Sequence, residues 1–424
     1  MTALLFIVFL VLLAIGFPIA FALGISAFTY LLFSDIPLMV IPQKMYAGID
    51  VFVLLSIPGF ILAGNLMNAS GITSRIINFC NALLGHIRGG LGLANVGASM
   101  LFGGISGTAI ADTASIGSVM IPAMKKEGYD VPFACAVTAS SSTIGPVIPP
   151  SLPMIIAATL TGLSVGKLFV AGIVPGLLLG VGFMLITYLI SVKRKYPKRE
   201  RKSLGFIFKS FFQAFWAIMM TVLILFGIIG GVFTPTEASI VAVIYAIAIG
   251  LWVYKELKIK MIPAILLQSA KTTAALMVLV GFANLFAWIM TVEELPQLIA
   301  NSLLELTNNK IMLLLLINLL LLFVGAFMET IAALLILFPV LLGVAVNVGV
   351  DPVQFAIIMV FNLVIGLTTP PVGVCLFVAS SIGGISLEKI AVAGLPYLMV
   401  SIFVLLLITY IPEVSLWLPG LFYD

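Results

Sequence analysis

The chain has 424 residues, of which 62% are hydrophobic and only 8% are charged, and its mean hydropathy is +1.29. This composition excludes the soluble globular classes, because too few polar side chains remain to cover a surface in contact with water. Several apolar runs reach the roughly 20 residues that a helix needs to cross a bilayer core. The sequence therefore predicts an all-α polytopic membrane protein.

The first apolar run, from Thr2 to Leu32, is predicted to be a retained membrane helix within an N-terminal region of residues 1–49. It lacks the basic start and the small-residue cleavage site of a signal peptide. Gly16 and Pro18 interrupt the run, but both residue types are tolerated in a membrane helix that has neighbours. Spans counted back from the basic connector described below predict a cytoplasmic N-terminus and a periplasmic C-terminus.

Residues 50–192 contain a Gly-rich apolar stretch with a polar centre, Ser106-Gly-Thr-Ala-Ile-Ala-Asp112. One tilted span with a polar stripe would explain this pattern. A re-entrant helical hairpin over about residues 91–124 explains it better, because glycines surround the turn and an Asp112 carboxylate facing lipid would be costly. Non-helical backbone at such depth requires a protein-lined or water-lined site.

The segment that follows the hairpin, about residues 131–163, is interrupted by Gly145-Pro-Val-Ile-Pro-Pro150. Proline removes a backbone donor and obstructs the carbonyl group one turn earlier, so a continuous helix is excluded here. We predict a broken helix whose freed carbonyl oxygens are available to a ligand.

A basic connector, residues 193–202, accounts for most of the net charge of +4. Nucleic-acid binding is one interpretation of such a run, but a cytoplasmic loop that obeys the positive-inside rule is far commoner between membrane spans. Residues 193–271 are predicted to comprise this loop and two linking spans, at about 211–232 and 236–254.

Residues 272–424 repeat the first half of the chain. An offset of 221 aligns Gly104 with Gly325, Gly128 with Gly349, and Gly145-Pro-Val-Ile-Pro-Pro150 with Gly366-Leu-Thr-Thr-Pro-Pro371. The second half is therefore predicted to contain a hairpin over about 311–343 and a broken helix over about 352–383. Its connections are acidic where those of the first half are basic, which indicates two inverted-topology repeats.

Two segments before the hairpins, residues 70–88 and 293–309, mix apolar with charged and polar residues. They are predicted to be interfacial amphipathic helices, or alternatively polar loops.

The polar residues of these segments suit cation coupling. Broken-helix carbonyl oxygens with the hydroxyl groups of Ser106 and Thr108 would bind a hard cation such as Na⁺. The alternative is a proton-coupled secondary transporter that uses Asp112 or Glu329 and is independent of a binding protein. The single histidine, the absence of a Walker A loop and the scattered cysteines argue against an enzyme, an ATPase and a structural metal site.

Three motifs, Gly103 to Gly117, Ile144 to Ser151 and Gly366 to Gly373, resemble the large membrane (M) subunit of tripartite ATP-independent periplasmic (TRAP) transporters. The resemblance covers essentially the whole chain. It implies a scaffold and an elevator-type transport domain in the bacterial inner membrane. It also implies Na⁺-driven import of an organic acid anion, such as sialic acid or a C4-dicarboxylate, with two or more Na⁺ ions, a periplasmic substrate-binding (P) protein and a separate four-helix (Q) subunit.

Transfer of the family's sites onto matching positions implies three groups of residues. The first sodium site would comprise Ser106 with carbonyl oxygens at Gly145, Ile148 and Pro150. The second sodium site would comprise Gly325, Met328, Thr330, Gly366, Thr369 and Pro371. The substrate would lie against Thr108, Asp112 and Glu329. Ser142, Thr143 and Ser151 would be either further ligands or caps of the broken ends.

Overall fold

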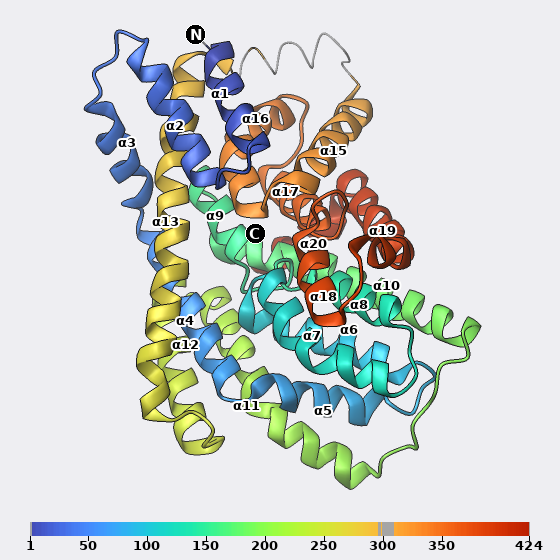
Figure 1. Ribbon diagram of the computed structural model, residues 1–424. Helices are drawn as coiled ribbons and strands as arrows, with labels where there is room; N and C mark the ends of the chain where they lie inside the picture. Colours follow the sequence, from blue (N-terminus) through green and yellow to red (C-terminus); the bar gives the residue numbers. More distant parts are fainter. Residues whose placement is uncertain (1, 296–297, 299–308, 424) are drawn as a thin grey trace.

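The computed structural model describes residues 2–295, 298 and 309–423, and within them the chain is helical with no β-strand (Figure 1). Eight helical segments of the described chain are long and apolar enough to cross a membrane: residues 52–69, 165–193, 204–229, 235–253, 259–292, 310–327, 330–347 and 387–410. The predicted all-α polytopic membrane architecture is confirmed.

The N-terminal apolar run differs from the single helix expected for it. It forms two short helices packed against each other, α1 (Thr2–Ala14) and α2 (Ile19–Leu32), because the chain turns at Gly16 with φ of +90°. Helix α1 has 13 residues, about 20 Å, and is too short to cross a bilayer core of about 30 Å.

The turn at Gly16 also affects the side of the membrane on which the N-terminus is expected. Phe6 and Phe9 of α1 pack on Phe286, near the end of α13 (Ile262–Val292) that is remote from the basic residues Lys255 and Lys260. The expectation of a cytoplasmic N-terminus counted Thr2 to Leu32 as one crossing, whereas this run forms two helices. With two helices in this run, the positive-inside rule predicts an N-terminus on the side opposite the basic residues.

A first group of helices is built on α13. Directly against α13 lie α2, α3 (Val40–Ile49), α4 (Ser56–Ala69) and the turn η3 (Ile259–Met261). Against α4 lie the 3₁₀ turn η1 (Phe52–Leu55) and α12 (Pro235–Ala248) with its π-helical extension η2 (Ile249–Val253), and α11 (Leu204–Ile229) packs on α12. The predicted linking spans correspond to α11 and to α12 with η2.

The predicted amphipathic segment 70–88 forms α5 (Ile72–Leu84), which packs between α6 (Gly90–Ser106) and α11. Its buried residues, among them Ile72, Ile76 and Cys80, share one face. The second such segment, 293–309, lies almost entirely outside the described residues.

The second group of helices contains the two repeats. The first repeat comprises the hairpin α6 and α7 (Ala109–Lys126), the broken helix α8 (Val131–Ser142) and α9 (Leu152–Thr161), and α10 (Val165–Lys193). The second comprises the hairpin α15 (Lys310–Phe327) and α16 (Thr330–Asn347), the broken helix α17 (Pro352–Gly366) and α18 (Val374–Gly383), and α19 (Leu387–Tyr410), which the C-terminal α20 (Glu413–Tyr423) follows.

Equivalent elements of the two repeats start at nearly constant offsets. Helices α7 and α16 both start and end 221 residues apart, and α10 and α19 start 222 residues apart. The cis peptide bonds Pro149–Pro150 and Pro370–Pro371 also lie 221 residues apart. The repeat predicted from short motifs therefore extends through the whole hairpin and broken-helix unit.

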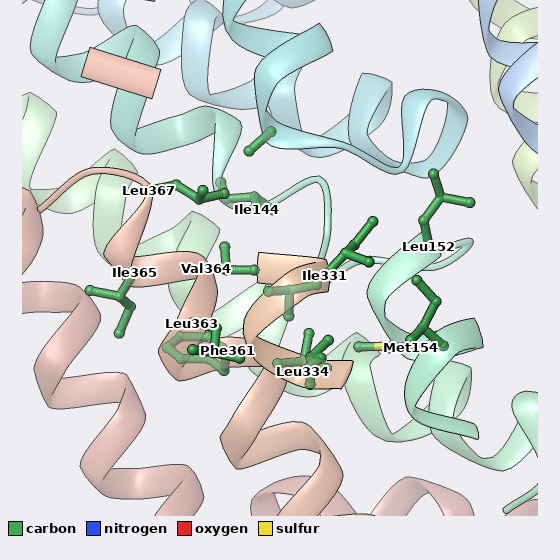
Figure 2. Packing of buried hydrophobic residues seen from close by; sticks show 14 of the residues in the cluster. Ile144, Leu152, Met154, Ile331, Leu334, Phe361, Leu363, Val364, Ile365 and Leu367 are labelled. Atoms are coloured by element: carbon green, nitrogen blue, oxygen red, sulfur yellow. The ribbon is translucent and has the colours of Figure 1, made fainter. Parts of the chain in front are cut away.

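The repeats interlock through their broken helices. Helix α9 packs against α16 of the second hairpin, while α18 packs against α7 of the first hairpin. The hairpins enter from opposite ends of the molecule, so their tips approach each other at its centre (Figure 1). Apolar side chains of α9, α16 and α17, including Leu152, Met154, Leu334 and Phe361, fill the space between the repeats (Figure 2).

The basic connector packs against the open end of the first hairpin. Arg194 and the Tyr196 hydroxyl group both bind the Asp130 carboxylate at 2.6 Å, and Arg199 pairs with Glu127. The hydrogen bond from Tyr196 lowers the pKa of Asp130 below its usual value, with Arg194 adding to the effect and partial burial opposing it. The basic residues therefore collect at the end from which the first hairpin enters.

Glycines set how closely each hairpin approaches its broken helix, and substitution of one of them should show this. A Cβ atom at Gly366 would lie 2.3 Å from the Gly325 carbonyl oxygen, whereas one at Gly343 in α16 would meet nothing within 4 Å. We expect Gly366→Ala to lower the free energy of unfolding by about 1–3 kcal/mol. Gly343→Ala should preserve or raise it, because alanine favours a helix by roughly 0.5–1 kcal/mol. Thermal unfolding of the purified protein measures both variants, and equal midpoints would contradict the expected contact.

Candidate functional site

The two hairpin tips face one cavity of about 610 Å³. The tips contribute residues 106–111 and 329–332, and α4 and the first half of α13 form the opposite wall. The polar residues that line it are Asn65, Asn68, Ser106, Thr108, Ser115, Gln268, Thr272, Glu329 and Thr330. Residues from the two repeats, more than 200 positions apart, thus share one site with the helices around α13.

The first tip is a turn of two residues. Gly107 has a positive φ of 62°, and Thr108 caps α7, its hydroxyl oxygen accepting a hydrogen bond from the Ala111 backbone N–H. Ser106 donates its hydroxyl hydrogen to Oδ1 of Asp112 across the turn, and its oxygen lies 3.3 Å from the Thr108 carbonyl oxygen. Oxygen atoms of three residues are therefore gathered within the tip.

Asp112 lies behind this tip, fully buried, and is not among the residues that line the cavity. Its Oδ2 atom has no hydrogen-bond partner among the described residues. A Cβ atom at Gly145 would lie 2.6 Å from this oxygen, so only glycine fits beside it without displacement. A buried carboxylate oxygen of this kind is satisfied by a cation, a proton or an ordered water.

The first broken helix places its backbone against the same tip. A Cβ atom at Gly107 would lie 3.1 Å from the Pro150 carbonyl oxygen, and one at Gly104 would lie 3.2 Å from that of Pro149. A small cavity of about 10 Å³, the volume of one water molecule or ion, is lined by Ser106, Gly107 and Pro150 among others. The structure thus brings Ser106, Gly145 and Pro150 together.

Ile148 is the remaining residue of the expected first sodium site. Its side chain packs against α10, since a Cβ atom at Gly176 would lie 2.5 Å from Ile148 Cγ1.

The hydroxyl groups around this break bind the local backbone. Ser142 donates to the Thr138 carbonyl oxygen at 2.8 Å, and Thr143 donates to that of Ser140 at 2.6 Å. Ser151 caps α9, accepting from the Met154 backbone N–H at 3.3 Å and donating to the Pro146 carbonyl oxygen. These contacts are those of helix-terminal and capping residues.

The second tip has a different chemistry at equivalent positions. Glu329 caps α16 in the place that Thr108 takes at α7, and one of its carboxylate oxygens accepts from the Ile331 and Ala332 backbone N–H groups at 2.9 and 3.2 Å. The Thr330 hydroxyl oxygen is buried and has no hydrogen-bond partner among the described residues. Met328 ends α15 as its C-cap.

The second broken helix is closed at one end and open at the other. Gly366 contacts Gly325 backbone to backbone, and the Val372 N–H donates to the Ala326 carbonyl oxygen at 3.3 Å. The Thr369 hydroxyl group donates to the Ile365 carbonyl oxygen, four residues earlier, at 3.0 Å. Pro371 is exposed. The structure therefore joins Gly325 to Gly366 and places Met328 and Thr330 in the adjoining tip, with Thr369 and Pro371 on the more open connection.

Three helices start at the large cavity. The first residues of α7, α9 and α16 all line it. Helix N-termini carry unpaired N–H groups and a partial positive charge, which bind anions. Among its lining residues in the described chain the cavity has no lysine or arginine, and Glu329 is its one carboxylate.

Sequence reasoning missed the wall opposite the tips. Asn65 and Asn68 of α4 and Gln268 and Thr272 of α13 line the cavity, and Asn68 donates to Ser115 of α7 at 2.9 Å. Isolated amide side chains in otherwise apolar spans were the available signal. The described residues contain no cluster of three or more His, Cys, Asp or Glu side chains that could hold a metal ion.

The sequence of the chain matches a family of known membrane transporters. Residues 6–414 match the family described as "Tripartite ATP-independent periplasmic transporter, DctM component". The C4-dicarboxylate TRAP transporter large permease protein DctM of Pseudomonas aeruginosa is 44% identical over 400 residues, which cover 94% of each chain. The sialic acid TRAP transporter large permease protein SiaM of Vibrio cholerae is 42% identical over 408 residues, 96% of each chain.

One solved structure has a similar fold. The YdaH transporter of Alcanivorax borkumensis superposes with a TM-score of 0.61, and the match covers 92% of this chain and 90% of that one. At 16% sequence identity, the likeness concerns the fold alone.

Cysteine labelling tests whether the cavity holds water. Thr272 lines the cavity, and Ala274, two residues along α13, is also exposed but does not line it. In a background without the three buried native cysteines, Thr272→Cys should react with a water-soluble maleimide in lipid nanodiscs. Ala274→Cys should react at least about tenfold more slowly, because lipid excludes the reagent and the thiolate. Equal rates would contradict a water-filled cavity at Thr272.

Proposed function

Because the chain belongs to the DctM family of tripartite ATP-independent periplasmic transporters, we propose that it is the large membrane subunit of a Na⁺-coupled importer of an organic acid anion. Its relatives are transporter permeases, and the chain is accordingly a transporter and not an enzyme. The proposal concerns the coupling ion, the substrate class, the movement and the partners.

The observation that carries the proposal is the meeting of two hairpin tips and three helix N-termini at one cavity. With no lysine or arginine in its described lining, the cavity can bind a carboxylate only through backbone N–H groups and neutral polar side chains. At α16 the Glu329 carboxylate already occupies the N-terminus, whereas the neutral Thr108 caps α7. We therefore place the substrate anion nearest α7 and α9.

The oxygen atoms of the first tip support sodium as the coupling ion. Hard cations prefer oxygen ligands, and Ser106, Asp112 and the carbonyl groups of the first break supply them at a buried position. A cation there would neutralise Asp112 and stabilise the tip next to an arriving anion. Sodium binding and anion binding would then favour each other, as a symporter requires.

The boundary between the two groups of helices supports an elevator-type movement. The cavity lies between α4 and α13 on one side and the hairpin tips on the other. Two side-chain hydrogen bonds of the described residues cross this boundary near the first tip: Asn68 to Ser115, and Thr221 to the Gly104 carbonyl oxygen at 3.0 Å. We propose that the repeats move as one body along α4 and α13 and carry the site with them.

The expected partners and location complete the proposal. The family's three-component architecture supports a periplasmic binding protein and a small membrane subunit, which we place on a separate chain. The basic connector would face the cytoplasm of a bacterium, with the protein in the inner membrane. The named substrates of the two relatives, a C4-dicarboxylate and sialic acid, define the class as organic acid anions and leave the individual acid open.

Proton coupling is the second candidate, because Glu329 lines the cavity and Asp112 has an unpaired buried oxygen. Either carboxyl group could bind the coupling proton in place of sodium.

Sodium-dependent stability provides a direct test of the first tip. We expect NaCl to raise the thermal midpoint of the purified protein relative to KCl at equal ionic strength, since a ligand stabilises the state that binds it. Ser106→Ala should remove most of this difference. Ser99→Ala is the matched control: it deletes a buried hydroxyl group in the same helix, bonded to Ser141 at 2.8 Å away from the tip, and should keep the sodium effect. An undiminished sodium effect in Ser106→Ala would count against the assignment.

Uptake into proteoliposomes that contain the small subunit and the binding protein distinguishes sodium from proton coupling. An imposed Na⁺ gradient without a pH gradient should drive uptake of labelled succinate or N-acetylneuraminate. Glu329→Gln should reduce this uptake about tenfold, the loss of one charge-assisted contact of roughly 1.5 kcal/mol. Asp351→Asn, which alters the equivalent cap of α17 outside the cavity, should reduce it less than about twofold. Uptake undiminished without sodium, and driven by a pH gradient through Glu329, would establish the proton alternative instead.

A further inference from the structure

A second cavity, of about 440 Å³, lies on the same boundary between the two groups of helices. Its walls are α3 and the second half of α13 on one side, and α9 and α16 on the other. The polar residues that line it are Lys44, Thr159, Asn284, Trp288 and Thr291. None of them belongs to the site described above.

The two cavities are stacked along three shared helices. Helix α9 lines the first with residues 152–153 and the second with 156–160, and α16 does so with 329–332 and then 335–339. Helix α13 lines the first with residues 268–279 and the second with 280–291. The buried side chains of Met154 and Leu334, which Figure 2 labels, belong to residues between these two sets and line neither cavity.

The cavities border opposite halves of α13. The first borders the half of α13 that starts beside the basic residues Lys255 and Lys260, and the second borders the half that ends near the N-terminal helices (Figure 1). If the repeats moved along α13, the hairpin tips would pass from the level of the first cavity to the level of the second.

The second cavity contains the positive charge that the first one lacks. Lys44 is its one charged residue among those described, and no described carboxylate pairs with it. Glu293, directly after α13, accepts a hydrogen bond from Tyr30 of α2. An ammonium group without a counter-ion in a cavity of low polarity attracts anions, because little water screens its field.

Several contacts hold Lys44 in place. The Asn284 side chain donates to the Lys44 carbonyl oxygen at 2.7 Å, and α3 lies so close to α13 that a Cβ atom at Gly48 would be 2.4 Å from Asn284 Cβ. The Lys44 ammonium lies 5.1 Å from the centroid of the Trp288 ring. A cation–π contact uses the charge but no N–H donor, so all three donors of the ammonium group remain available.

We propose that this cavity is a second binding site for the transported anion, in which Lys44 binds an acidic group of the substrate. The proposal rests on the proposed transport of an organic acid anion. On the side remote from the basic connector, Lys44 attracts the anion and holds it next to α9 and α16. Lys44 lies on α3, outside the repeats, so it stays behind when the repeats move along α13.

Charged thiol reagents test the site without relying on transport. A cysteine at Thr159, in a background without native cysteines, is labelled with anionic sulfonatoethyl and with cationic trimethylammonioethyl methanethiosulfonate. Each rate is normalised to that of a free thiol, with the full chain in nanodiscs. We expect Lys44→Gln to lower the anionic-to-cationic ratio by about threefold or more. Thr272→Cys, in the cavity without a lysine, is the matched control and should keep its ratio in Lys44→Gln.

Protection by organic acids tests binding itself. Succinate, isethionate or N-acetylneuraminate, at ionic strength matched with chloride, should slow labelling of Thr159→Cys at least about twofold, and Lys44→Gln should abolish the protection. An unchanged ratio in Lys44→Gln, or no labelling at Thr159→Cys, would overturn the proposal. A changed ratio without protection by any of these acids would overturn it too, since Lys44 would then supply a field but no site. If the wild-type assembly takes up none of these acids, the proposed function is wrong. The labelling result does not depend on uptake and would still test the second site.

Discussion

Every helix that ends inside this membrane protein must satisfy its backbone polar groups without water, and the centre of the molecule is built around this constraint. Helices α6, α8, α15 and α17 end there, and α7, α9 and α16 start there. Side-chain caps at Thr108, Ser151 and Glu329 bind part of the free N–H groups. The remaining free groups are concentrated at one place, where we propose that ions and an anion bind.

Close backbone approach makes this concentration possible. Gly103 meets Gly145 in the first repeat, and Gly325 meets Gly366 in the second. Any side chain at these positions would hold the hairpin away from its broken helix and would separate the carbonyl oxygens of the break from the tip. These glycines contribute no functional group, but the geometry of the site depends on them because they allow the backbones to approach.

The two repeats share a backbone but differ in chemistry. The first has a neutral cap at Thr108 and a buried proline break, and its carboxylate, Asp112, lies behind the tip. The second has an acidic cap at Glu329 that faces the cavity, and an exposed break at Pro370 and Pro371. The duplicated scaffold thus carries two tips with different chemistry, which suits the proposed binding of cations and an anion side by side.

Helices outside the repeats form one wall of each cavity. Helix α13, with 31 residues, runs along both cavities and contributes one wall to each. It offers amide and hydroxyl groups to the cavity at the tips and, with α3, a lysine to the other cavity. The boundary along α13 therefore borders one cavity without a lysine and one that contains Lys44.

The local breaks of this fold were predictable from the sequence, because they depend on residue types. Prolines at 149, 150, 370 and 371 exclude a continuous helix wherever they occur, and glycines beside polar residues mark the tips. The offset of 221 then predicted that both halves repeat one unit, and the helix boundaries agree with it. The N-terminal run was misjudged since a Gly-Phe-Pro turn in an apolar run resembles a tolerated kink when its neighbours are unknown.

Only the tertiary structure decided which of these elements meet. Composition could not place Asn68 and Gln268 opposite Ser106, direct the Ser142 and Thr143 hydroxyl groups to their own helix, or set Lys44 in a cavity with Trp288. Such contacts join residues far apart in the chain, and their geometry depends on the packing of all the helices between them. The sequence by itself determined where the helices break, since that is local chemistry; the packing of the repeats against α13 decided what the breaks face.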